Sequence, residues 1–150
     1  MALKGDRHEL DTDISFFLNE TAEKGQVVSV STQGSGAAMD NSSALATVAA
    51  EASGAVALGV LLNDMVNIDQ TRQHINWHKD EVQKGGKVTI LTKGFVVTDQ
   101  ISGNPTAGQV AYLADSGLIA GTQDGTAPAI GRFLSTKDAD GFAKVSINLP

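Results

Sequence analysis

The chain has 150 residues, of which 41% are hydrophobic, with a formal net charge of −6 and no cysteine. This length suits one domain with one core, and the lack of cysteine excludes disulfides, thiol catalysis and thiolate metal sites. The excess of acidic residues argues against direct binding of nucleic acid, which depends on Lys and Arg to neutralise phosphates. No apolar run approaches the roughly 20 residues of a membrane span and no signal-peptide core is present, so we expect a soluble protein without membrane contact that acts where it is made.

The N-terminal segment, residues 1–13, is polar and charged and has no hydrophobic period. It has too little apolar surface to offset the entropy of ordering, which predicts a flexible or extended arm ahead of a single β domain over residues 14–150. Phe16 and Phe17 follow in a short apolar run. We predict a first strand or turn that plugs the core; the alternative is an anchor on a neighbouring subunit, which makes both phenylalanines candidate partner contacts.

Residues 26–62 carry very little charge, which indicates burial in the core or against another subunit. The alternation in residues 26–31 predicts a strand. Residues 44–62 are compatible with an alanine-rich helix capped by a serine, or with two strands separated by a turn at residues 51–54. We predict the two strands, because Thr47 and Val48 before the turn and residues 56–62 after it favour strands.

The C-terminal half reads as short strands punctuated by glycine. Each run is rich in β-branched or aromatic residues and is bounded by turn formers. The predicted strands are residues 87–92, 94–98, 108–113, 129–134 and 142–149. We therefore predict an all-β fold, a small β-barrel or β-sandwich with an extended N-terminal arm and long glycine-rich loops.

A short internal echo supports the strand prediction. The phrase Gly-Gln-Val begins at Gly25 and again at Gly108, and each is followed later by Ala-(Leu/Ile)-Gly, at residues 57–59 and 129–131. A glycine inside each closing strand is typical of a bulge or of a close backbone approach in a curved sheet. The echo suggests a turn-and-strand unit that is used twice.

One polar segment contains the residues that could support chemistry or binding. His74 and His78 are four apart with acidic residues after them, a spacing that could hold zinc on a helix. The surrounding residues disfavour a helix, so we predict hydrogen-bonding or interface residues and no metal. Trp77 lies between the two histidines and Arg72 lies nearby, and Trp and Arg are frequent in binding hot spots. All four are candidate partner contacts.

No other motif predicts catalysis. The sequence has no Gly-x-Ser-x-Gly nucleophile elbow. Asp138 and Asp140 resemble the start of a calcium loop, but Gly141 comes too early and no glutamate follows at the required distance. We therefore predict a hairpin turn there, and for the whole chain no catalytic residue, no cofactor and no metal.

Several glycine-centred phrases resemble the small capsid decoration, or cement, proteins of tailed bacteriophages. They are KDEVQKGGKVTILTKGFVVT (79–98), PTAGQVAYL (105–113), IGRFLSTKDADGFAKV (130–145) and VLLNDMVNIDQTRQH (60–74). The resemblance implies a non-enzymatic virion protein, made in the host cytoplasm, that binds the outer surface of the head and stabilises the mature capsid across capsomer junctions. The implied partners are the major capsid protein and copies of the chain itself, with a trimer preferred over a dimer.

Three other functions remain as alternatives. The first is a tail or head-completion structural protein. The second is a small β-barrel metal-dependent enzyme that uses His74 and His78. The third is a ligand- or glycan-binding module, which the shortage of aromatic residues disfavours.

Overall fold

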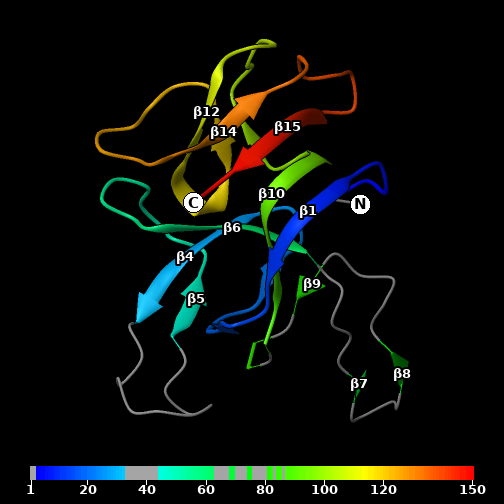
Figure 1. Ribbon diagram of the computed structural model, residues 1–150, viewed down its shortest axis with the longest axis vertical. Coiled ribbons are helices and arrows are strands. Elements are labelled where there is room, and N and C mark those ends of the chain that lie inside the picture. The colour runs from blue at the N-terminus through cyan, green and yellow to red at the C-terminus, as the bar shows by residue number, and fades with distance from the viewer. Residues whose placement is uncertain are drawn as a thin grey trace.

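Strand pairing organises nearly all of the chain. The computed structural model describes residues 3–32, 44–62, 68–69, 74–75, 81–82, 84–85 and 87–150 (Figure 1). The strands are β1 (His8–Asp13), β2 (Phe17–Leu18), β3 (Ala22–Glu23), β4 (Val27–Thr32), β5 (Leu45–Thr47), β6 (Ala57–Leu62), β7 (Ile68–Asp69), β8 (His74–Ile75), β9 (Glu81–Val82), β10 (Thr89–Thr98), β11 (Ile101–Ser102), β12 (Val110–Leu113), β13 (Ile119–Ala120), β14 (Ala129–Phe133) and β15 (Ala143–Asn148). The helical structure in the described residues is a single 3-10 turn, η2 (Asp115–Gly117). The all-β prediction is confirmed.

One 11-stranded sheet contains most of these strands. Its order is β11-β13-β12-β14-β15-β10-β6-β4-β5-β2, and β1 pairs with the remaining edge of β10. Two small pairs, β3–β9 and β7–β8, lie outside it. Among the described residues the end strands β2 and β11 do not pair with each other, so the sheet is open rather than a closed barrel. Its two halves instead fold back on each other face to face.

The two halves of the sheet contain equivalent strands in mirrored order. About the β15–β10 junction, β14 corresponds to β6, β12 to β4, β13 to β5 and β11 to β2. We call β2, β4, β5, β6 and the first part of β10 the N-unit, and β11 to β15 the C-unit. Even the parallel pairs match, since Leu18 lies opposite Ala46 in the N-unit as Ile101 lies opposite Ile119 in the C-unit. The chain is thus a structural repeat.

The same turn opens the hairpin in each unit. In the N-unit the side-chain oxygen of Gln26 accepts a hydrogen bond from the backbone N–H of Glu23 at 2.9 Å. In the C-unit Gln109 accepts one from Thr106 at 2.8 Å. The repeated Gly-Gln-Val phrase therefore encodes a turn in which the glutamine side chain accepts a hydrogen bond from the backbone N–H three residues earlier.

The two glycines of the closing strands also have one role. The register slips by one residue just before Gly59 in β6 and just before Gly131 in β14. A Cβ on Gly59 would overlap the carbonyl oxygen of Leu91, and a Cβ on Gly131 would overlap that of Ser146. The predicted bulge and close backbone approach are both present, because only glycine lets the neighbouring strand come this near.

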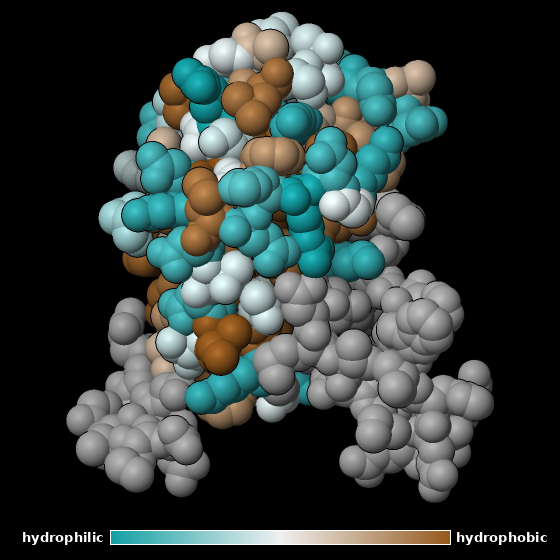
Figure 2. Space-filling view, turned by 45° about the vertical axis from the view of Figure 1, so that its right-hand side comes forward, coloured by the Kyte–Doolittle hydropathy of each residue, from teal (hydrophilic) through white to brown (hydrophobic). Residues whose placement is uncertain are grey.

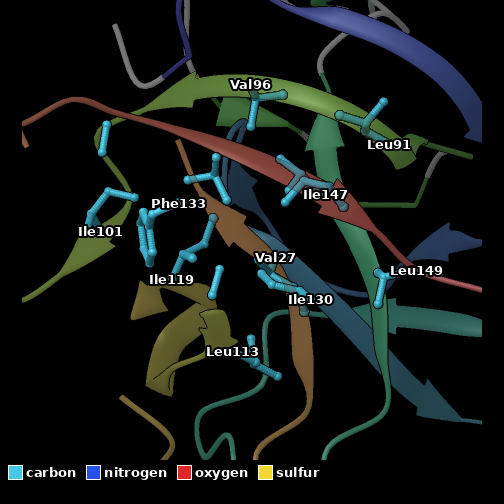
Figure 3. Close-up of a cluster of buried hydrophobic side chains, with 14 of the residues drawn as sticks. Val27, Leu91, Val96, Ile101, Leu113, Ile119, Ile130, Phe133, Ile147 and Leu149 are labelled. Carbon is cyan, nitrogen blue, oxygen red and sulfur yellow. The ribbon is translucent and has the colours of Figure 1, made fainter. Parts of the chain in front are cut away.

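Two hydrophobic cores lie on opposite faces of the N-unit. The first core joins the units, and Figure 3 shows Val27 and Leu91 of the N-unit close to Ile130 and Ile147 of the C-unit within it. Its other members include Val60, Leu62, Leu113, Ile119, Phe133 and Val145. The second core covers the other face of the N-unit and includes Leu18, Ala22, Val28, Ala46, Leu61, Val82, Val88 and Ile90. We call the face with Val28 the front of the N-unit and the face with Val27 its back. By strand correspondence, the C-unit front carries Ala111 and its back carries Val110.

Most strand predictions agree with the structure. Residues 44–62 form β5 and β6 with a turn at Ser53–Gly54, so the two-strand prediction is confirmed and the helix alternative is wrong. The two strands predicted on either side of Gly94 are one strand, β10. Gly94 adopts φ +140° and a Cβ there would overlap the His8 carbonyl oxygen, so this glycine admits the neighbouring strand β1 rather than ending β10.

Replacement of Gly131 by alanine is expected to destabilise the protein by about 2 kcal/mol, because the added methyl must displace the backbone of β15. Gly5→Ala is the matched control, since a Cβ at Gly5 meets nothing within 4 Å. Its effect is expected to stay within about 0.5 kcal/mol. Urea unfolding measures both; equal effects of the two substitutions would show that the close approach at Gly131 is absent.

Candidate interaction surface

The back of the C-unit is a strand face turned to solvent. In β15, Val145 and Ile147 point into the first core, so Lys144, Ser146 and Asn148 point outward. The register then carries this outer face across the sheet. We define the C-unit back face as Lys93, Phe95, Val110, Tyr112, Arg132, Leu134, Lys144, Ser146 and Asn148.

Apolar side chains are exposed on this face. Val110 is 45% exposed and Leu134 is 38% exposed, and on the adjoining strand β1 Leu10 is 70% exposed. On the side of the molecule drawn in Figure 2, apolar residues are scattered among polar ones rather than gathered in one patch. The C-unit back face combines its apolar residues with polar ones such as Ser146 and Asn148, and surfaces that bind other proteins are commonly mixed in this way.

The sheet strands of this face carry positive charge only, and the adjoining strand β1 places Asp11 opposite Lys93. Strands β10, β12, β14 and β15 contain Lys93, Arg132 and Lys144 and no acidic residue. None of these three cations forms an ion pair with any residue that the structure describes. Lys144 Nζ lies 3.9 Å from the ring centroid of Phe95, a cation–π contact that leaves its charge near the surface.

Two open, shallow depressions mark the face. One is lined by Ala129, Gly131, Arg132, Ser146 and Asn148. The other is lined by His8, Leu10, Lys93, Gly94, Phe95, Leu134, Ser146, Ile147 and Asn148. In the second depression the ring of His8 stacks on that of Phe95, with 5.9 Å between the ring centroids.

The predicted contact residues Phe16 and Phe17 lie in the N-unit. Phe16 is half-buried, packs against the second core, and accepts a hydrogen bond from the Val88 N–H through its carbonyl at 3.2 Å. Phe17 is in β2, with Lys87 Nζ 5.4 Å from its ring centroid. Leu18 beside them is fully buried, so the run does form the first core strand of the repeat.

The structure does not place the other four predicted contact residues on the C-unit back face. Arg72, Trp77 and His78 lie outside the described residues, and His74 is described only as part of strand β8. The search for partner contacts from the sequence missed the C-unit back face. The sequence contained one indication of this face. Val110 and Tyr112, and likewise Arg132 and Leu134, are two residues apart in predicted strands, so each pair shares one side of its strand.

The structure also tests the acidic turn at residues 136–141. Asp138 Oδ1 accepts hydrogen bonds from the backbone N–H groups of Phe142 at 2.9 Å and Asp140 at 3.0 Å. The bond from Phe142 is the main cause that lowers the pKa of the Asp138 carboxyl below its ordinary value. The carboxylate is used to close the β14–β15 hairpin, and the predicted hairpin turn is confirmed. No group of three His, Cys, Asp or Glu side chains in the described part of the chain could hold a metal ion.

These features are typical of a binding or structural protein. The exposed apolar and basic side chains lie on a regular strand face, which suits attachment to the surface of a larger assembly. Nor does the described part of the chain contain a helix long and apolar enough to cross a membrane.

Comparison with known proteins gives the family. Residues 7–148 match the family described as "Structural cement protein (E217 gp24/Pam3 gp6)", and the chain belongs to this family of phage cement proteins. It is therefore a structural protein of the phage virion that associates with the capsid and stabilises it. None of the curated proteins compared with the chain matches it.

The Asp138 turn gives a pH-dependent prediction. A carboxyl whose pKa is lowered by folding adds stability that is present above the unfolded pKa and is lost as the pH falls through the folded pKa. Wild type should be more stable than Asp138→Asn at pH 6, and the difference should shrink as the pH falls below 3.8, the ordinary value for this carboxyl. Thermal unfolding from pH 6 to pH 2 measures it, and a difference independent of pH would contradict the assignment.

Proposed function

We propose that this cement protein binds the outer surface of the phage head, contacts the major capsid protein and spans junctions between neighbouring capsomers. The observation that supports the proposal most strongly is the family match over nearly the whole chain. The exposed C-unit back face supports it further, because it offers a broad surface for a macromolecular partner.

The physical effect of such binding is simple. A protein that bridges two capsomers adds interface that must be broken before they separate. If it binds the assembled shell and not the dissociated subunits, it stabilises the shell by mass action, by about 2.7 kcal/mol per site at a free concentration 100-fold above Kd. No catalytic step is needed, and we propose no enzymatic role, no cofactor, and no nucleic-acid or membrane partner.

We further propose that the protein is made in the host cytoplasm and acts as a homo-oligomer, with a trimer preferred over a dimer. Residues 14–150 would form the β domain of each copy, and residues 1–13 an extended arm. Strand β1 supports the extended arm, since it is an extended segment paired along β10 with five of its six residues exposed. Contacts between copies or with the shell would use Phe16, Phe17, Arg72, His74, Trp77 and His78.

Binding to heads is the decisive test. Purified protein is added to mature heads that lack it, and the heads are sedimented and also heated. Saturable co-sedimentation and a higher dissociation temperature of the heads are expected. Heads already saturated with the protein are the control and should take up no more. No co-sedimentation with bare heads would contradict the proposed function.

The oligomeric state is tested separately. Sedimentation velocity is expected to show a species of three times the chain mass of 15.5 kDa. A dimer would overturn the preferred stoichiometry, and a monomer at all micromolar concentrations would overturn the homo-oligomer itself.

A further inference from the structure

We propose that the C-unit back face is the surface that docks on the head, and that it meets an acidic surface of the capsid protein. This inference rests on the proposed function and deepens it by assigning the docking face and the chemistry of its partner. It is carried by the repeat, by the exposure of apolar side chains and by charge.

The repeat shows what this face does in the other unit. One row across the back of the N-unit is Val27, Val60 and Leu91, and the same row in the C-unit is Val110, Arg132 and Ser146. All three N-unit side chains are 0% exposed, because the front of the C-unit covers them in the first core. The same sheet face is therefore a packing interface within the molecule and an uncovered surface at its C-terminal end.

A second row gives the same contrast. Leu62 corresponds to Leu134, and the exposed fraction rises from 1% in the N-unit to 38% in the C-unit. Thr89 corresponds to Lys144, and burial gives way to a half-exposed cation. Exposed apolar residues on a regular strand face lack the stabilisation that burial would give. A partner that covers them would recover it.

Charge identifies the kind of partner. Arg132 and Lys144 give the β14–β15 part of this face a positive character within a chain of net charge −6, whereas Lys93 lies opposite Asp11 of β1. Two copies that met through this face by two-fold symmetry would place these cations against each other, which is unfavourable. An acidic partner surface is complementary, so the capsid shell, rather than a second copy in the same orientation, is the occupant that we propose.

Reversal of one charge tests the inference. Arg132→Glu is expected to weaken binding to bare heads by at least tenfold, and to reduce the loss of affinity on raising the salt concentration. Lys84→Glu is the matched control, because Lys84 is an exposed turn residue between β9 and β10, away from the C-unit back face, and its replacement changes the net charge equally. Its affinity should stay within about twofold of wild type. Thermal unfolding of each variant establishes that the fold is retained.

A second substitution tests an apolar position of the face by placing a negative charge on it. Val110→Asp, at a half-exposed apolar position in the same row, is expected to weaken binding at least as strongly as Arg132→Glu. Should either variant be less stable than wild type, affinity is compared at a temperature where all of them are folded.

The outcomes separate this inference from the proposed function. Failure of the wild-type protein to bind heads would remove both. Binding by wild type that neither Arg132→Glu nor Val110→Asp weakens would overturn the docking face and leave the proposed function standing. Loss of the oligomer in either variant, with the binding of preformed oligomers unchanged, would assign the face to a second copy and would likewise overturn the inference.

Discussion

The hydrogen-bonded pairing of β10 with β15 is the constraint on which the rest of the structure depends. Residues 93–98 of β10 pair with β15, residues 89–91 pair with β6 on the same side, and β1 occupies the opposite edge. One long strand thus belongs to both halves of the repeat. It also supplies both cores, since Ile90 lies in the second core and Leu91 in the first. Removal of this strand would leave two half-sheets, each with an uncovered apolar face.

The two units show how far one backbone pattern can serve different environments. The turn glutamine, the bulge glycine and the strand register recur in both, because each satisfies backbone groups or avoids a backbone overlap. Side chains are free to differ where the register alone is fixed. Val60 is part of the core because the C-unit half of the same sheet lies over it. Arg132, at the same place in its own unit, is exposed because nothing in the described chain covers it. Burial is a property of what packs on a strand, not of the strand.

That distinction explains what the sequence could predict. Runs of β-branched residues gave the longer strands, and the repeated Gly-Gln-Val phrase gave the turn. Strand β1 has no hydrophobic period in the sequence, since it is held by backbone pairing along one edge of β10 and five of its six residues are exposed. The two-residue strands β11 and β13 were too short to show any alternation. The symmetric strand order could be seen only once those pairs were known.

The candidate surface was hidden from the sequence for the same reason. Val110 and Leu134 lie in strands that read as core strands, and only the tertiary arrangement leaves them exposed. The segment around Trp77 was predicted to contain partner contacts because of its residue types, and residue types alone do not show which neighbours a side chain has. A search for partner contacts by composition therefore favours polar, irregular segments and passes over a regular strand whose outer face is unpaired.

The repeat also bears on how a clamp of this kind would transmit force. A load applied to the C-unit back face reaches the N-unit through the β10–β15 pairing and through the first core, which both units build together. A ladder of paired residues and a close-packed core resist deformation together, because neither can yield without exposing the other. A hinge between two separately folded domains would let capsomers move before the clamp resisted. In the proposed bridging role, a single folded-back sheet would resist from the start, because the two units are joined through one shared strand.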